Sequence, residues 1–288
     1  MAQVSIRDAI DMHLHPFPCI FPRLADDWEV VHSAQAAGMQ AIVLKSHHES
    51  TVSRSYLLSQ KTPDLKVFGG VVLNSFVGGI NPAAVEAALA LGGKTVWMPT
   101  VDAAHHARVY GSTGGYDRQK GHVKSAGPGI STLQQGKLTP ETHEVVRLVA
   151  EHRAILGTSH ISPEEIKELV TEARKAGVEK ILIQHPLFRV PNLPMEMIEE
   201  LVSLGATLEI DYCGISPWWA AVKLEDLVHL IEVFGSEHCI LVSDTGQTHN
   251  PMPCEALRLL AQNLHEKGIA EKDLYTMMVT NPKQLLGI

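Results

Sequence analysis

The sequence predicts a single (β/α)8 barrel, the TIM-barrel fold, in which eight parallel strands alternate with helices around a closed core. Three observations favour this fold: the length of 288 residues, eight short runs of apolar and β-branched residues, and helix-like stretches between most of these runs. Eight such units fit a closed barrel better than an open sheet, and the length is typical of one barrel. We find no repeat or linker, and therefore expect residues 1–288 to form one domain.

The predicted elements alternate almost from end to end. The strands are Ser5–His13, Gln40–Lys45, Lys66–Leu73, Lys94–Met98, Ala154–Thr158, Lys180–Gln184, Ala206–Ile210 and Cys239–Ser243. The helices are Trp28–Ala37, Pro82–Leu91, Pro140–His152, Pro163–Ala176, Met195–Leu204, Leu224–Phe234 and Cys254–Lys267.

Several predicted helices carry capping signals at their ends. Ser162 precedes Pro163 and two glutamates, which supplies a cap residue, a proline at the first helical position and acids at the positive end of the helix dipole. Asn81-Pro82 and Thr139-Pro140 repeat the device. Glycines suited to a helix C-terminus follow four helices, at Gly38, Gly92, Gly177 and Gly205.

Two segments depart from the alternation. The stretch Thr100–Lys137 contains Gly, Lys and His, and shows little apolar periodicity. Because it follows the fourth strand, we expect an inserted structureless loop, residues 100–138, that covers the barrel mouth as an active-site lid. After Leu274 the sequence predicts one extra C-terminal helix packed under the barrel.

The composition narrows the class of partner. The formal net charge is −8 and the basic residues are scattered, which argues against a nucleic-acid groove or an anionic membrane surface. The N-terminal residues lack the pattern of a signal peptide, and no apolar run approaches the roughly 20 residues that span a bilayer. The four cysteines form no CxxC pair, which argues against a zinc finger or a disulfide framework and fits a reducing cytoplasm. We expect a cytoplasmic protein that acts on a small molecule, and leave a homo-oligomer open.

Potential metal ligands follow five of the predicted strands, at the C-terminal ends where active sites of such barrels lie. His13 and His15 are two apart at the end of the first strand, so they point to the same face. The second strand ends in Lys45, with His47 and His48 just after it. His160, His185 and Asp244 follow the fifth, sixth and eighth strands. Converging imidazole and carboxylate groups predict a metal centre.

This set of residues resembles the amidohydrolase superfamily of metal-dependent hydrolases. His13-x-His15, His160, His185 and Asp244 occur in that order on strands one, five, six and eight, and the closing Asn281-Pro282-x-x-Leu285-Leu286-Gly287 resembles the usual C-terminal run of the superfamily. The resemblance implies that His13, His15 and Asp244 hold one metal ion and that His160 and His185 hold a second. It implies one or two divalent ions, with zinc expected and manganese, iron or nickel as alternatives.

The resemblance also implies a carboxylated lysine or a glutamate that bridges the two ions, usually on strand four. The predicted fourth strand ends Trp97-Met98-Pro99-Thr100-Val101-Asp102 and offers neither. We expect Lys45 to be the substitute, as a bridging ligand or catalytic group, with His47 on the same face of its strand. A site with a single metal ion remains an alternative.

The expected chemistry is hydrolysis. A divalent metal lowers the pKa of its bound water from 15.7 to about 7 and polarises the oxygen of the bond under attack. Asp244 is the predicted general acid and base. Asp11, two residues before His13, is the predicted carboxylate that orients the histidine ligands. The bond attacked would be an amide, an ester or lactone, or a related bond.

Candidates for substrate contact are Arg23, which could bind an anionic group, together with His48, Glu209 and Tyr212. Further candidates for the anionic group are Arg54, Arg118 and Lys120, and Asp102 is read as a turn residue unless it enters the site. The helical histidines are interpreted as surface groups. His105 and His106 are interpreted as exposed loop residues.

Other functions stay open. Leu44-Lys45-Ser46-His47-His48 resembles the second-strand motif of the PHP phosphoesterases, although Asp244-Thr245-Gly246 lacks the Asp-x-His of their last strand. A metal-dependent decarboxylase or lyase could use the same scaffold. A metal-free aldolase with Lys45 as Schiff-base nucleophile is the alternative without a metal.

Overall fold

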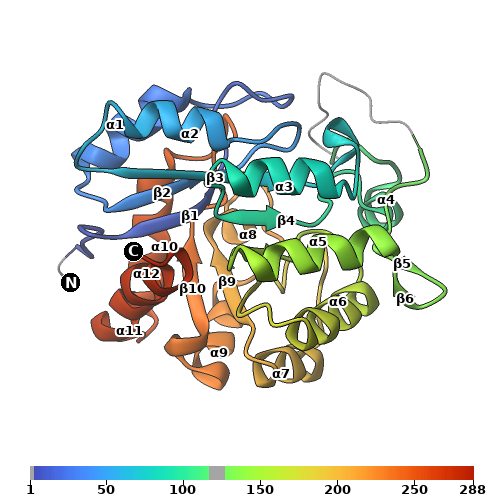
Figure 1. The fold of residues 1–288 in the computed structure, drawn as a ribbon. Helices are drawn as coiled ribbons and strands as arrows, with labels where there is room; N and C mark the ends of the chain where they lie inside the picture. The colour runs from blue at the N-terminus through green and yellow to red at the C-terminus, as the bar shows by residue number, and fades with distance from the viewer. Residues whose placement is uncertain (1–2, 117–126) are drawn as a thin grey trace.

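The computed structural model describes residues 3–116 and 127–288 and contains a parallel barrel of eight strands (Figure 1). Neighbouring strands follow the order β1-β2-β3-β4-β7-β8-β9-β10. The strands are β1 (Ile10–Leu14), β2 (Ala41–Leu44), β3 (Lys66–Val72), β4 (Thr95–Trp97), β7 (Ile155–Gly157), β8 (Lys180–Ile183), β9 (Thr207–Asp211) and β10 (Cys239–Val242). Every ladder between them is parallel, so the predicted (β/α)8 fold is confirmed.

The main correction concerns the first strand, which was predicted to begin at Ser5. Residues 6–9 instead form a turn in which the amide of Ala9 donates to the carbonyl of Ile6 at 3.0 Å. Asp8 adopts a φ of 64° in this turn, which an extended strand does not allow. The strand therefore begins at Ile10.

Helices cover the outside of the barrel (Figure 1). The longer ones are α1 (Asp27–Ala36), α2 (Val52–Ser59), α3 (Pro82–Ala90), α5 (Pro140–Glu151), α6 (Pro163–Lys175), α7 (Met195–Ser203), α9 (Leu224–Phe234) and α10 (Pro253–Glu266). All of these except α2 were predicted. The predicted cap is present at α6, where Ser162 and Glu165 form a reciprocal capping box, and the four glycines after helices have φ between 71° and 95°.

The barrel closes between β1 and β10. The amide of Asp244 donates to the carbonyl of His13 at 2.8 Å, and the amide of His15 donates to the carbonyl of Thr245 at 2.8 Å. Asp11 strengthens this seam, since its Oδ1 accepts hydrogen bonds from the amides of Ser243 and His13. The seam thus lies directly beneath the residues predicted to bind metal.

Apolar side chains fill the barrel interior and its floor. The interior cluster consists of Ile10, Met12, Ala41, Val43, Val72, Trp97, Ile155, Leu182, Ile240, Val242, Leu285 and Leu286. The last two belong to α12 (Asn281–Leu286), which follows α11 (Glu271–Tyr275) and a π-helical turn at Thr276–Thr280. The predicted C-terminal helix is therefore present, in three pieces, and its last piece closes the end of the barrel opposite the predicted site.

The segment after β4 is not structureless, contrary to the prediction. It contains α4 (Ala104–Tyr110) and a short antiparallel pair, β5 (Leu133–Gln134) with β6 (Lys137–Leu138). Its role as a lid stays a prediction. The remaining short elements are α8 (Tyr212–Ile215) and single turns at Ser75–Val77 and Ser236–His238. No helix in the described ranges is long and apolar enough to cross a membrane.

Candidate metal centre

A β-bulge in β1 turns both strand-one histidines into the barrel. Asp11 pairs with Ile42 and Leu14 with Leu44, so three steps along β1 match two steps along β2. Ile42 and Leu44 belong to the outer core cluster, which places Asp11 and Leu14 on the outward side. Met12 belongs to the interior cluster, and the extra residue lets His13 face inward as well.

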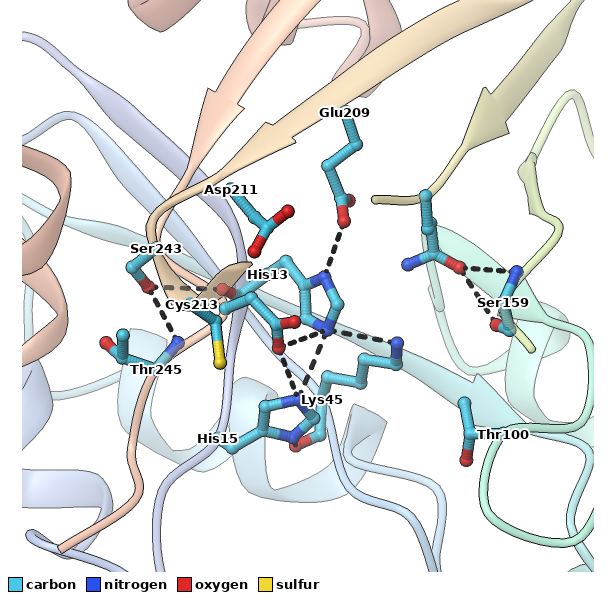
Figure 2. Close-up of polar contacts among 12 residues, drawn as sticks. His13, His15, Lys45, Thr100, Ser159, Glu209, Asp211, Cys213, Ser243 and Thr245 are labelled. Atoms are coloured by element: carbon cyan, nitrogen blue, oxygen red, sulfur yellow. Dashed lines mark hydrogen bonds and ion pairs between the residues drawn. The ribbon is translucent and has the colours of Figure 1, made fainter. Parts of the chain in front are cut away.

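Three ligand-type atoms form a nearly equilateral triangle at the mouth of the barrel (Figure 2). The Nε2 atoms of His13 and His15 are 3.1 Å apart. Oδ1 of Asp244 is 3.0 Å from the first and 3.1 Å from the second. Among the described residues, these three side chains form the group of potential metal ligands whose ligand atoms all lie within 4.8 Å of one another.

The outer hydrogen bonds of the two imidazoles fix which nitrogens carry protons. Nδ1 of His15 is 3.1 Å from the carbonyl oxygen of Lys45, which can only accept, so this nitrogen is the donor. Nε2 of His13 is 3.0 Å from the Lys45 amine, and Nδ1 of His13 is 2.8 Å from Oε1 of Glu209. If the Lys45 ammonium donates to Nε2, His13 must donate from Nδ1 to Glu209. Neither Nε2 atom then carries a proton: that of His15 presents its lone pair to the triangle, and that of His13 accepts from Lys45, so a metal ion bound there would replace the Lys45 hydrogen bond.

Burial keeps these histidines neutral. Desolvation lowers the pKa of His13 to about 3 and of His185 to about 3, although the charge of Asp244 opposes the shift in both. Burial also holds the pKa values of His15, His47 and His160 well below the ordinary value. Neutral imidazoles keep a lone pair available, as a metal ligand requires.

Three acceptor atoms about 3 Å apart repel one another unless a cation lies among them. Ligand atoms that hold zinc tetrahedrally at about 2.0–2.1 Å are roughly 3.3 Å apart, close to the observed separations. Two imidazole nitrogens and one carboxylate oxygen are also a donor set that zinc prefers. The residues present therefore fit a divalent metal ion.

Lys45 follows the end of β2 and lies beside this triangle, with its Nζ 3.0 Å from Nε2 of His13; its role as a bridging or catalytic group stays a prediction. Its side chain is buried, and its Nζ is 5.3 Å from the centre of the Trp97 ring. Burial lowers the pKa of Lys45 to about 8, against the charges of Asp244 and Glu209, which raise it. The amine is thus poised between its charged and neutral forms near neutral pH.

Glu209, rather than Asp11, is the carboxylate that contacts the imidazole of His13. Asp11 was predicted for this position because it is two residues before His13, but the bulge places it on the other face, where it joins the β1–β10 seam. Glu209 pairs in register with Ile240, an interior residue, and so points into the barrel. Burial raises the pKa of Glu209 to about 8, with the nearby Lys45 charge lowering it. Glu209 was predicted to contact the substrate, but it lies beneath His13 and does not line the pocket.

His160 and His185 lie next to the triangle but outside it. Their ring centroids are 5.1 Å apart, and that of His185 is 6.2 Å from that of His13. Nδ1 of His185 is buried and has no hydrogen-bond partner in the described structure. A second metal ion held by these two residues stays a prediction.

His47 stacks on His15 with ring centroids 4.7 Å apart, and its Nδ1 is 2.9 Å from the hydroxyl of Thr100. It lines the same pocket, but its role as a ligand stays a prediction. His106, which was expected in an exposed loop, is buried on α4 with its Nδ1 2.9 Å from that of His160. Sequence reasoning missed it because no helix was predicted there.

The remaining candidates divide between the pocket and its surroundings. Arg23 lines the pocket, whereas His48 is half-buried beside it and forms a hydrogen bond with Ser46. Tyr212 is buried at the start of α8 and is not a pocket-lining residue. Arg54 is bonded to Asp27 and Glu49.

Asp102 accepts hydrogen bonds from the amide and hydroxyl of Ser75 and so has a structural position, in keeping with its reading as a turn residue. Arg118 and Lys120, which were also candidates for anion binding, lie outside the described residues.

The fold and the metal-ligand geometry place this chain among (β/α)8 barrels with a candidate metal centre at the strand C-termini. Its fold is similar to that of an amidohydrolase from Pseudomonas aeruginosa, with a TM-score of 0.65 and 12% identity over 97% of this chain and 96% of the other. It is also similar to an organophosphorus hydrolase from Deinococcus radiodurans (TM-score 0.59, 12% identity, 99% and 97% covered). A third similar structure is a phosphotriesterase homology protein from Escherichia coli (0.58, 15%, 96% and 98%). The sequence-based resemblance to the amidohydrolase superfamily thus agrees with the fold.

The chain itself belongs to the family of unknown function DUF6282, whose model matches residues 8–209. That match covers β1 to β8 and the first three residues of β9, and it includes all of the candidate site residues except Asp244 and Tyr212. No curated protein sequence matches the chain.

Proposed function

We propose that this protein is a metal-dependent hydrolase that holds a divalent cation, with zinc expected, through His13, His15 and Asp244. One observation carries the proposal: three buried or half-buried acceptor atoms from the two ends of the chain meet at 3.0–3.1 Å, and the hydrogen bonds around the two imidazoles leave both Nε2 atoms without a proton. A divalent cation bound among these three atoms would offset their mutual repulsion. Similarity in fold to an amidohydrolase and to an organophosphorus hydrolase supports hydrolysis as the reaction.

A bound divalent cation would lower the pKa of a water ligand to about 7 and polarise the oxygen of the bond to be cleaved. Asp244 is the general acid and base in this proposal. Its Oδ1 belongs to the triangle, and the carboxylate reaches the pocket, so its other oxygen can take a proton from the attacking water and pass it to the leaving group.

Other residues position or assist. Glu209 fixes the orientation and tautomer of His13, and the backbone of Lys45 does the same for His15. Lys45 is proposed as a further ligand or as a proton carrier, because its buried amine can be neutral near neutral pH. His160, His185 and His47 are proposed to contact the substrate or a second cation, since all three line the pocket.

The first experiment measures metal content of the purified protein by plasma mass spectrometry and then hydrolysis of an amide, ester, lactone and phosphoester panel. We expect at least one divalent ion per chain, loss of hydrolysis after chelation, and its return with zinc or manganese. His13→Ala and Asp244→Asn should lose both metal and hydrolysis. His143→Ala, an exposed histidine on α5, is the matched control and should lose neither. A wild-type protein that binds no metal at saturating zinc would contradict the proposal.

Lys45 favours one alternative, a Schiff-base reaction without metal. Its amine is buried, and its lowered pKa makes it a better nucleophile than an ordinary lysine. Borohydride reduction in the presence of a carbonyl substrate would then trap a covalent adduct on Lys45, and activity would survive chelators. A metal-dependent decarboxylase is separated from a hydrolase by release of CO2 without incorporation of water oxygen.

A further inference from the structure

A guanidinium group lines the pocket above the triangle and presents two unpaired donors. Arg23 lies in the loop after β1, where its backbone pairs with that of Gln247 and the neighbouring Leu24 amide donates to the carbonyl of Gly246 at 2.8 Å. These bonds fix the loop against the end of β10. Nε and Nη2 of Arg23 are both buried, and neither has a hydrogen-bond partner within the described residues.

Two buried donors without an acceptor are costly, so their retention calls for an explanation. No carboxylate in residues 3–116 or 127–288 forms an ion pair with Arg23. Arg54, by contrast, forms ion pairs with two carboxylates, those of Asp27 and Glu49. The unpaired edge of Arg23 points to an anion that is absent from the protein itself.

The two free nitrogens define the shape of that anion. Nε–H and Nη2–H lie on the same edge of the planar guanidinium, and parallel hydrogen bonds from this edge match the two oxygens of one carboxylate. The same pocket is lined by His15 and Asp244, so an anion bound to Arg23 would share the cavity with the proposed metal centre.

Aromatic rings form the rest of the pocket wall. Phe21, Tyr116, Phe188 and Trp219 line it, and the ring of Trp219 lies 5.3 Å from that of Tyr116 and 6.0 Å from that of Phe188. The cavity that these rings leave open is about 30 Å³, so a ligand with a ring enters only when the aromatic side chains move apart. Flat apolar walls favour a planar or aromatic body on such a ligand.

We propose that the substrate is a small aromatic carboxylate, whose carboxylate binds the Nε and Nη2 edge of Arg23 while its scissile amide, ester or lactone group faces His15 and Asp244. As a statement about substrate, this rests on the proposed hydrolase function. The anion subsite formed by Arg23 does not.

Binding of benzoate to chelator-treated protein, measured by titration calorimetry, tests the subsite without the metal as a competing anion site. Arg23→Gln should weaken benzoate binding by about 10- to 100-fold, the range for a charge-assisted pair of hydrogen bonds. Benzamide, which has the same shape without the charge, should bind the wild type weakly and the variant equally weakly. Arg147→Gln, an exposed arginine on α5, is the control and should bind benzoate like the wild type.

Thermal unfolding of the same variants separates binding from structure. Because the free edge of Arg23 has no protein partner, Arg23→Gln should not lower the midpoint of unfolding. Equal benzoate affinity in wild type and Arg23→Gln would overturn the proposal, and so would a wild type that binds no benzoate. Arg23-dependent binding of inorganic phosphate in place of benzoate would overturn the carboxylate and assign a phosphoryl group.

The two proposals fail separately. If benzoate binding depends on Arg23 but no substrate is hydrolysed, the hydrolase function fails and the anion subsite stands. If chelator-sensitive hydrolysis is found and benzoate does not bind, the subsite alone fails.

Discussion

Glu209 offers the sharpest test of how this barrel builds its metal centre. The side chain is buried, and Nδ1 of His13 is 2.8 Å from its Oε1. It forms no hydrogen bond with His15 or Asp244, the other two residues of the triangle. Replacing it should therefore change the metal centre through the orientation and basicity of a single imidazole. We predict that Glu209→Leu weakens zinc binding by about 10- to 100-fold.

The magnitude follows from the contact. Removing one partner of a buried hydrogen bond costs about 1–3 kcal/mol, which corresponds to roughly a 5- to 150-fold change in affinity. Glu209→Gln keeps an acceptor oxygen and the shape of the side chain, so its effect should fall at the lower end of the range. Glu209→Leu removes the acceptor, so its effect should fall at the upper end.

The assay is competition for zinc against a chromophoric chelator, with circular dichroism to show that each variant is folded. Asp102→Asn is the matched control, because Asp102 is an equally buried carboxylate that binds Ser75 instead of a ligand imidazole. If Glu209→Leu retains wild-type zinc affinity, the assignment of Glu209 as the residue that positions His13 is refuted.

Three further predictions concern the frame around the site. Gly246 has a φ of 138°, and a Cβ there would overlap the carbonyl oxygen of His15, so Gly246→Ala should lose metal binding. Gly268 has a φ of 106° and open space around it, so Gly268→Ala should keep metal binding. Metal analysis of both variants checks this prediction. Leu286→Ala removes a buried side chain from the barrel floor and should lower the free energy of unfolding in urea by about 2–5 kcal/mol without changing zinc affinity. Burial raises the pKa of the Cys19 thiol, but the hydrogen bond with His48 and the charge of Arg23 outweigh it and bring the pKa to about 7. Iodoacetamide should therefore modify Cys19 first, at a rate that rises with pH through about 7, whereas Cys239, with a pKa raised by burial to about 12, should stay unmodified in mass spectrometry of the folded protein.

Local signals in the sequence were sufficient to predict most of the barrel. Ser162 and Glu165 act within one helical turn, and the apolar runs of the strands are buried on both faces, so each can be recognised without knowledge of its neighbours. Two of the helices that were not predicted, α2 and α4, lack this kind of signal. Neither Thr51 before α2 nor Ala103 before α4 provides a side-chain cap, and α4 lies in a stretch without apolar periodicity.

The site was predicted as a set of residues at strand ends, but the contacts among them required the structure. Strand alternation correctly indicated that His13 and His15 share a face. The same rule assigned Asp11 to the imidazole of His13, because a sequence does not reveal a bulge between two residues of one strand. The signal for Glu209 was an acidic residue in the middle of a buried strand, which indicates an interior partner, but its register with β10 had to be known before that partner could be named.

The geometry of the centre depends on departures from regular backbone at four strand ends. β1 has its bulge, and Ser159, His185 and Asp244 adopt φ values of 54°, 33° and 47° just after β7, β8 and β10. Left-handed backbone costs a residue with a side chain roughly 1 kcal/mol or more, and it persists only where surrounding contacts impose it. At Asp244 this contact is the hydrogen bond from its backbone amide to the carbonyl of His13, which also closes the barrel. Closure of the sheet and convergence of the ligands therefore have the same cause: the hydrogen bonds that join the first and last strands also bring Asp244 to the two histidines.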